Sequence, residues 1–553
     1  MPADASARMN GEKTIPAQLD ELFTSWNRDD APGLIVGVAK SGQLIYRRAF
    51  GMASLETCVA NTPKTRMRIG STTKHFTSLL ALLLAEEGKL NIDSPIRNYL
   101  PEMVNVGGDP TLRQLMQHTG GSRCYLDLAF VVNGPDGMLR RGDALKIQAR
   151  QHGRNFAPGE AMTYNNGGYH LLSLAIERAG GQAFADQLRT RFFEPLGMID
   201  TALVSSDVEI TPGIATLHMQ VEGGRWRRGL FNAESKGEGG IVSTVDDMLR
   251  WAAHLRSRDR FGTPATWKTL RALPTFADGS HGIYALGLMV DTYRGLKVVH
   301  HGGTVMGGSS QMLSVTDFEL DIVILANGAP GAAPAKLTEQ IIDIILAGHV
   351  GEKDPAVLAK DHSALIGDWW SPKTEMLYSL IDHEGELRCK LGNVPAPYIL
   401  KRGADGMPVM AAHAHGEVRF RETKDRDELE IGFCGSWAIY QRVSRGYGAL
   451  APFAKSVSGS YYAHDADARA EIRVDGERTT MRLSGAHGYV DVLITPLAEN
   501  VAVTDPHASE FGGWSALTFD KNEGVATSFR LNNWRTRNLE FVRAQSPDRS
   551  GKN

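Results

Sequence analysis

The sequence has little of what marks membrane, metal-binding or redox proteins. Its four cysteines are scattered, without a CxxC pair or the spacing of zinc ligands, so we expect reduced thiols and neither a disulfide framework nor a metal centre. The richest apolar run, Leu79 to Leu84, is far shorter than the roughly 18–20 residues of a membrane span. Residues 1–14 lack the apolar stretch of a secretory signal. We therefore predict a cytoplasmic protein without a membrane partner.

The charge balance and the missing nucleotide motifs exclude further classes. Charged residues make up 22% of the chain and the formal net charge is -3, so no basic surface for nucleic acid is expected. No GxGxxG fingerprint and no P-loop is present, and we infer no cofactor. The oligomeric state stays open, with a homodimer as one option because dimers are common among soluble enzymes.

The length of 553 residues predicts two or three domains. In the first, residues 15–350, a strand-turn-strand pattern over Gly33 to Phe50 and a group of late strands between Ile283 and Ala326 enclose predicted helices. Strands at both ends of a segment with helices between them indicate an antiparallel sheet flanked by helices. The fold class is therefore α+β.

After about Gly351 the pattern changes to short alternating strands separated by turn residues. A repeat is visible: the stretch 365–370 (LIGDWW) matches 457–462 (VSGSYY), and the endings at 438–443 and 538–543 also agree. We predict two small antiparallel β-barrel domains of similar fold, over residues 355–447 and 455–545.

A serine and a lysine stand one helical turn apart at the start of the predicted helix that contains Leu79 to Leu84. Ser71 and Lys74 are three residues apart, so their side chains would lie on the same face. A serine hydroxyl needs a neighbour that takes its proton, and a lysine can do so when burial lowers its pKa. Alone, the pattern also fits an N-cap serine beside a solvated lysine.

Two further groups supply the rest of a serine hydrolase site. Tyr164 and Asn166 lie in a predicted loop after a Pro-Gly pair; a phenol can shuttle a proton, and an amide can bind both lysine and substrate. His301 follows a predicted strand and precedes two glycines. A backbone N–H near Gly303 or Thr304 could stabilise an oxyanion together with the N–H of Ser71.

The order SxxK, YxN, HxG resembles the serine β-lactamase and penicillin-binding-protein family. Two more segments agree: Leu115–Gly121 resembles its "LLxHTSG" stretch, and Gly239–Met248 its "GGxxST..DL" stretch. The resemblance implies Ser71 as nucleophile, Lys74 and Tyr164 as the proton-transfer pair, and Asn166 and His301 as substrate-side groups. Which member of the pair is the base stays open.

The third motif departs from the Lys-Thr-Gly that β-lactamases and D,D-peptidases usually carry. A histidine is mostly neutral near pH 7, so the attraction for a free substrate carboxylate is weaker. With two C-terminal barrels, the chain resembles the bacterial D-aminopeptidases. In that group a loop of the last barrel helps to bind the substrate ammonium. The corresponding stretch here is about Ser484 to Asp491, and Asp491 is the predicted partner of the amine.

The predicted function is a serine peptidase or amidase that acts on a small peptide or amide, releasing N-terminal D-residues or cleaving peptides that contain them. Three alternatives stay open. A peptidase for linearised microcystin has the same motifs, a β-lactamase-like carboxylesterase would need no ammonium site, and a non-catalytic binding protein could keep the fold.

Overall fold

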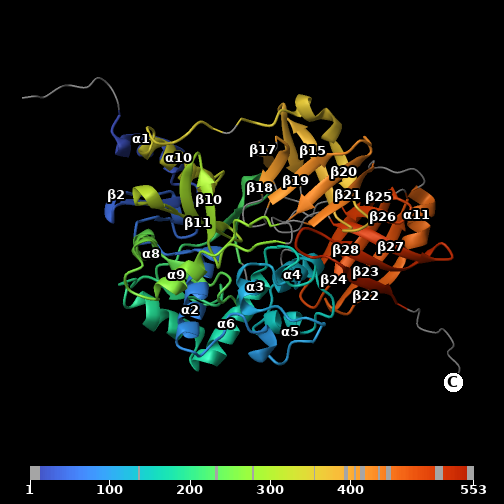
Figure 1. Ribbon diagram of the computed structural model, residues 1–553, viewed down its shortest axis with the longest axis horizontal. Helices are drawn as coiled ribbons and strands as arrows, with labels where there is room; N and C mark the ends of the chain where they lie inside the picture. Colours follow the sequence, from blue (N-terminus) through green and yellow to red (C-terminus); the bar gives the residue numbers. More distant parts are fainter. Residues whose placement is uncertain are drawn as a thin grey trace, which may run out of the picture.

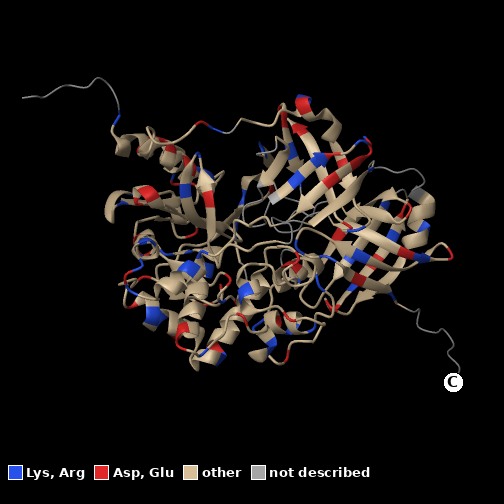
Figure 2. Cartoon of the chain, viewed as in Figure 1, with Lys and Arg blue, Asp and Glu red and all other residues tan. Residues whose placement is uncertain are grey.

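The computed structural model (Figure 1) describes residues 13–134, 137–230, 234–276, 279–353, 355–390, 397–403, 406–411, 417–433, 436–443, 450–476, 478–504 and 515–544. Within these ranges, no helix combines the length and the apolar character that crossing a bilayer requires. Basic and acidic residues are interspersed on the helices and on the strands of both barrels (Figure 2).

A six-stranded antiparallel sheet forms the centre of the N-terminal part, in the order β10, β11, β12, β13, β1, β2. As predicted, the late strands return to the early hairpin: β13 pairs with β1 from Leu320 to Ala326. Every residue of β13 is buried, because helices cover both faces of the sheet. The strands are β1 (Leu34–Lys40), β2 (Gln43–Phe50), β10 (Met289–Tyr293), β11 (Leu296–Val305), β12 (Gly308–Val315) and β13 (Leu320–Ala326).

Alternate residues of the strands pack into two different cores, one on each side of the sheet. Val36 and Ile324 join helices α1 (Ile15–Phe23) and α10 (Pro334–Ile345) in one core. Ile35 and Val323 join α8 (Val245–Ser257) and α2 (Lys74–Glu86) in the other. The predicted layered arrangement of sheet and helices is therefore confirmed.

Helix α2 lies in the middle of the helical layer, and its first eleven residues are all buried. A single turn of 3₁₀-helix, Gly70–Thr73, leads into it. The remaining helices of this part are α3 (Leu112–Met116), α4 (Tyr125–Asn133), α5 (Asp143–Ala149), α6 (Asn166–Gly180), α7 (Phe184–Leu188) and α9 (Pro264–Leu270). Its short strands are β3 (Met52–Ser54), β4 (Val59–Ala60), β5 (Met67–Arg68), β6 (Ala202–Leu203), β7 (His218–Gln220), β8 (Trp226–Arg228) and β9 (Ile241–Ser243).

Two closed eight-stranded antiparallel barrels follow. The first contains β14 (Gly367–Trp370), β15 (Leu377–His383), β16 (Glu386–Lys390), β17 (Tyr398–Arg402), β18 (Pro408–Ala411), β19 (Glu417–Glu422), β20 (Glu428–Phe433) and β21 (Ser436–Val443). After helix α11 (Leu450–Val457), the second contains β22 (Gly459–Ala463), β23 (Ala468–Asp475), β24 (Arg478–Ser484), β25 (Tyr489–Ala498), β26 (Val501–Thr504), β27 (Ala516–Asn522), β28 (Val525–Asn532) and β29 (Leu539–Arg543).

The sequence repeat of the barrels has a physical cause at the seam between the first and last strands. In the last barrel, the Arg543 guanidinium carbon lies 4.8 Å from the centre of the Tyr461 ring, and a Cβ on Gly459 would collide with that arginine. Arg442 takes the same position over the Trp369 ring of the first barrel, at 4.2 Å. The glycine leaves room for an arginine that closes each barrel by packing on an aromatic ring.

Candidate active site

Ser71 and Lys74 meet at the start of α2. The Nζ atom of Lys74 lies 2.9 Å from Oγ of Ser71, as the spacing of one helical turn predicts. Gly70 has a φ of +52°, a conformation that a residue with a Cβ adopts at a cost. A Cβ there would lie 3.1 Å from the backbone nitrogen of Thr304, so glycine lets the turn approach β11.

Lys74 is 0% exposed, and two other acceptors surround its amine. Oδ1 of Asn166 lies at 2.8 Å and the backbone carbonyl of Glu238 at 2.7 Å. Burial lowers the pKa of Lys74 to about 7, against a smaller opposing effect of the Glu238 carboxylate. The amine is therefore about half neutral at pH 7 and able to accept the proton of Ser71.

Tyr164 contacts both the serine and the lysine. Its hydroxyl shares a hydrogen bond with the side chain of Ser71, and its ring centre lies 4.8 Å from Nζ of Lys74. Burial raises the pKa of Tyr164 well above its usual value. The phenol therefore stays protonated at neutral pH and can donate or relay a proton, whereas Lys74 has the pKa of a base.

A buried carboxylate stands behind the lysine, and sequence reasoning missed it. Oε1 of Glu238 accepts a hydrogen bond from the Tyr125 hydroxyl at 2.8 Å and lies 3.0 Å from Nδ1 of His170. Burial acts to raise the pKa of Glu238, but His170 and the hydrogen bonds bring it below its usual value. The ionised carboxylate holds the segment whose carbonyl binds Lys74. The sequence marks Glu238 only by its position directly before the Gly239–Met248 segment.

The free edge of β11 faces the nucleophile. Strand β10 pairs with β11 only as far as His300, so from His301 onwards that edge has no strand partner among the described residues. A Cβ on Gly303 would lie 2.0 Å from the carbonyl oxygen of Ile69. Glycine is thus required for the strand to pack against the turn that carries Ser71. The backbone of Thr304 lies at the same contact, where an oxyanion donor was predicted.

His301 joins the group, and both nitrogens of its ring lie within hydrogen-bond distance of protein oxygens. The side chain is 1% exposed, Nε2 lies 2.9 Å from the Tyr284 hydroxyl, and Nδ1 lies 2.6 Å from the carbonyl of Gly302. Burial lowers the pKa of His301 well below its usual value, so the ring is neutral. In this arrangement His301 anchors β11 to Tyr284 and supplies no cation to the site.

Asp491 was predicted to lie in a loop, and the structure corrects that part of the prediction. Asp491 lies within strand β25 rather than in a loop, at an outward-facing position of the alternating pattern. Its carboxylate pairs with exposed Arg482, with the two closest atom pairs at 2.7 Å. The carboxylate is therefore already paired with a cation of the neighbouring strand, and its role in binding a substrate amine stays a prediction.

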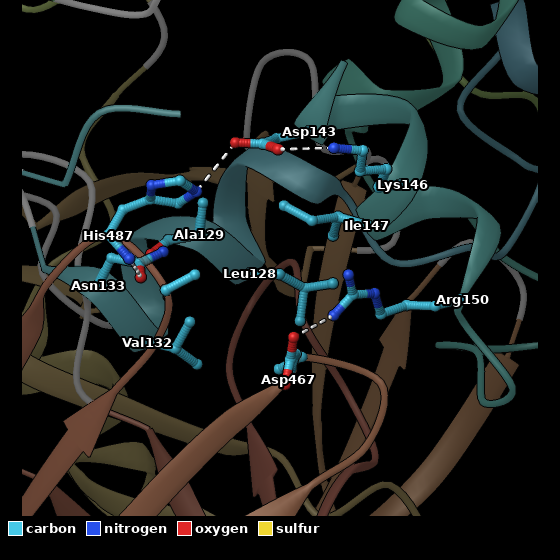
Figure 3. Close-up of a pocket in the computed structure, with 12 residues that line it drawn as sticks. Leu128, Ala129, Val132, Asn133, Asp143, Lys146, Ile147, Arg150, Asp467 and His487 are labelled. Carbon is cyan, nitrogen blue, oxygen red and sulfur yellow. Dashed lines mark hydrogen bonds and ion pairs between the residues drawn. The ribbon is translucent and has the colours of Figure 1, made fainter. Parts of the chain in front are cut away.

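The loop between Ser484 and Tyr489 docks at the C-terminal end of α4. The backbone N–H of His487 donates to Oδ1 of Asn133, the last residue of α4, at 2.9 Å, and the imidazole pairs with Asp143 (Figure 3). These contacts line a pocket between α4, α5 and the last barrel. A helix of nine residues is about 13 Å long, and Asp127, in the first turn at the other end of α4, interacts electrostatically with Tyr164.

A different loop of the last barrel reaches the site. It joins β28 to β29 and carries Arg535, whose guanidinium carbon lies 5.2 Å from the centre of the Tyr164 ring. One nitrogen of Arg535 lies 3.4 Å from Oδ1 of Asp127, in the first turn of α4. No sequence motif marks Arg535 or Asp127, because the two residues meet only through packing of the last barrel.

The arrangement is suited to nucleophilic attack by Ser71 on a carbonyl carbon, with Lys74 and Tyr164 to move protons. Metal chemistry has no ligand set among the residues that the structure describes, since no three His, Cys, Asp or Glu side chains form a group that could hold an ion.

Comparison with known proteins gives a family and a set of relatives. Residues 17–347 match the family described as Beta-lactamase. A D-aminopeptidase of Brucella anthropi is 29% identical over 533 residues, 93% of this chain and 96% of the relative. A D-aminopeptidase of Brucella canis is 29% identical over 372 residues, 66% of this chain and 68% of the relative.

Two solved structures share the fold. The octameric penicillin-binding protein homologue from Pyrococcus abyssi superimposes with a TM-score of 0.54 at 18% identity, covering 95% of this chain and 99% of its own. The structure of SurE superimposes with a TM-score of 0.51 at 24% identity, covering 77% of this chain and 98% of its own.

Proposed function

The chain belongs to the beta-lactamase family, and from that premise we propose that it is a serine peptidase or amidase that releases N-terminal D-residues or cleaves peptides containing them. The proposed reaction proceeds through an acyl-enzyme at Ser71. The observation that carries it is the pairing of Ser71 with a buried lysine whose pKa is about 7.

The first half of the proposed reaction forms the acyl-enzyme. Neutral Lys74 takes the hydroxyl proton of Ser71 while Oγ bonds to the carbonyl carbon of the substrate. The resulting oxyanion accepts hydrogen bonds from the backbone N–H groups of Ser71 and Thr304. The carbon–nitrogen bond then breaks, and the leaving amine receives a proton through Tyr164, which Lys74 replenishes.

The second half returns the enzyme to its starting state. A water molecule gives a proton to Lys74 or Tyr164, the proton-transfer pair of the first half, and its oxygen bonds to the acyl carbon. The bond from that carbon to Oγ breaks, Ser71 regains its proton, and the free acid leaves. Because Asn166 and the Glu238 carbonyl hold Lys74 in place throughout, no side chain has to move far between the two halves.

The substrate side of the proposal is supported by the relatives. The D-aminopeptidase of Brucella anthropi aligns over 93% of this chain, which includes both barrels as well as the family domain. A carboxylesterase would need only the family domain, so the alignment over the barrels favours a peptide or amide substrate.

The test compares D-alanine p-nitroanilide, L-alanine p-nitroanilide and p-nitrophenyl butyrate, with Ser71→Ala protein as the blank. Selective turnover of the D-amide that is lost in Ser71→Ala supports the proposal. If only the ester is turned over, the carboxylesterase alternative replaces the proposed peptidase or amidase. If the L-amide is turned over as fast as the D-amide, the proposed preference for D-residues is wrong. Ser363→Ala, at an exposed serine, is the control and retains activity.

A further inference from the structure

The last barrel holds its β28–β29 loop rigidly against the catalytic domain. Oδ1 of Asn533 accepts hydrogen bonds from the N–H groups of Arg535 and Thr536, at 3.0 and 2.7 Å. Asn155 of the catalytic domain binds the same loop twice, donating to the carbonyl of Arg535 and accepting from the N–H of Arg537, both at 2.8 Å. The position of the Arg535 backbone is therefore defined from both domains.

A second anchor fixes the end of this loop. The Arg123 side chain, from a residue that is 1% exposed, donates to the carbonyl oxygens of Arg537 and Asn538 and to the carboxylate of Asp465. A buried guanidinium satisfied in this way by the neighbouring barrel is strong evidence for a single docked arrangement. The loop thus presents Arg535 to the active site as a preorganised group.

The guanidinium of Arg535 lies one side chain away from the nucleophile. It packs over the ring of Tyr164, whose hydroxyl contacts Ser71, and Asp127 holds it from the side of α4. Its side chain keeps 27% of its surface exposed, whereas that of Asp127 keeps 12%. Burial acts to lower the pKa of Arg535, but Asp127 and other neighbours hold it above its usual value, so the cation persists.

Arg535 is a permanent cation, whereas the other two basic groups of the site, Lys74 and His301, are not permanently charged. The pKa of Lys74 is about 7, and the imidazole of His301 is neutral and bound to Tyr284. The strand motif therefore provides no fixed positive charge. An arginine is the side chain best suited to bind a carboxylate, through two parallel hydrogen bonds.

We propose that Arg535, brought to the active site by the last barrel, is a specificity-determining residue that binds a carboxylate of the substrate. The proposal rests on the peptidase or amidase function above and narrows its substrate class to short D-residue peptides with a free carboxylate near the scissile bond. In the reaction this carboxylate stays on the leaving amine and takes no part in bond making or breaking.

The experiment measures the preference for a carboxylate with a matched pair of substrates, D-alanyl-glycine and D-alanyl-glycinamide. The quantity compared is the ratio of their kcat/KM values in wild type, Arg535→Gln and Arg535→Lys. Wild type favours the free acid. Loss of a charged hydrogen-bond partner reduces this ratio by about tenfold or more in Arg535→Gln, and Arg535→Lys retains part of the preference.

Arg537→Gln is the matched control, because Arg537 lies in the same loop but packs its side chain over Phe433 of the first barrel. It removes the same charge from the loop and leaves the ratio at the wild-type value. The midpoint of thermal unfolding, measured for all variants, separates a loss of docking from a loss of recognition, since poor docking lowers the turnover of both substrates together.

A ratio in Arg535→Gln within twofold of wild type overturns the proposal. The same ratio is measured with a second pair of substrates in which an ester is cleaved, 4-acetoxybenzoate and 4-acetoxybenzamide. If neither peptide is cleaved but the esters are, the proposed peptidase function fails while the ester ratio still decides the role of Arg535. Equal turnover of the acid and the amide by wild type in both pairs counts against Arg535 as an anion site. No turnover of any of the four substrates removes the proposed peptidase or amidase function, and the proposal for Arg535 falls with it.

Discussion

Acidification below pH 7 is expected to suppress the reactivity of Ser71 by protonating Lys74. In the proposed reaction the hydroxyl loses its proton to the neutral amine, and burial places the pKa of Lys74 at about 7 instead of its ordinary 10.5. At about 1.4 kcal/mol for each tenfold change, the difference between these values favours the neutral amine by about 5 kcal/mol. Protonation therefore matters in the range where most enzymes work.

The size of the effect follows from the fraction of neutral lysine. That fraction is about one half at pH 7, about a tenth at pH 6 and about a hundredth at pH 5. The rate should thus fall about fivefold from pH 7 to pH 6 and about tenfold from pH 6 to pH 5, and it should level off above pH 8. A lysine with the ordinary pKa would instead be neutral in about one molecule in 3,000 at pH 7.

The assay is the rate at which an uncharged fluorophosphonate labels Ser71 between pH 5 and 9, followed by mass spectrometry. The reagent has no ionisable group, so the profile reports the free enzyme alone. Tyr164→Phe is the informative variant. Because Lys74 keeps its burial, the midpoint should stay near pH 7 while the plateau falls.

A profile that keeps rising through pH 9 would refute the reasoning, since it would assign the base an ordinary or raised pKa. If the labelling rate of Tyr164→Phe no longer fell below pH 7, the assignment of Lys74 as the base would also be refuted, and Tyr164 would be identified as the base. A midpoint near pH 7 in both proteins assigns that role to Lys74.

Three other perturbations test the surroundings of the nucleophile. Glu238→Gln removes a buried carboxylate that raises the pKa of the active-site lysine, so the midpoint of the same labelling profile should move to lower pH by up to about one unit. Gly303→Ala places a Cβ 2.0 Å from the Ile69 carbonyl oxygen and should reduce labelling about 100-fold by displacing the β11 edge. Arg123→Met leaves Asp465 without its buried partner and should weaken docking of the last barrel by about 3–5 kcal/mol, seen as faster limited proteolysis.

Two of these variants, Gly303→Ala and Arg123→Met, have a matched control. Gly348→Ala introduces a Cβ with no atom within 4 Å and should label like wild type; equal labelling of the Gly303 variant would contradict the edge contact. Arg113→Met breaks a pair with Asp93 that is much more exposed, so its cost should stay below about 1 kcal/mol. Equal proteolysis of the two arginine variants would show that Arg123 does not hold the barrel. A midpoint that rises in Glu238→Gln would contradict the proposed electrostatics.

Local spacing was enough to predict much of the site and of the fold. Ser71 and Lys74 meet because three residues make about one helical turn, whatever surrounds the helix. Alternation and turn residues predicted the barrels because strand periodicity is a property of the chain itself. The closing arginines of the two barrels are likewise repeated in the sequence, at Arg442 and Arg543.

What the sequence determined by itself was therefore the residues that act within one helix, loop or strand, and the family they belong to. Only the tertiary structure decided which carboxylate and which cation stand beside the nucleophile. Asp491 was expected in a loop but lies at an exposed position of a strand, and Arg535 was invisible because docking of the last barrel brings it to Tyr164. Contacts between residues hundreds of positions apart depend on how separately folded units pack, and no local pattern encodes that packing.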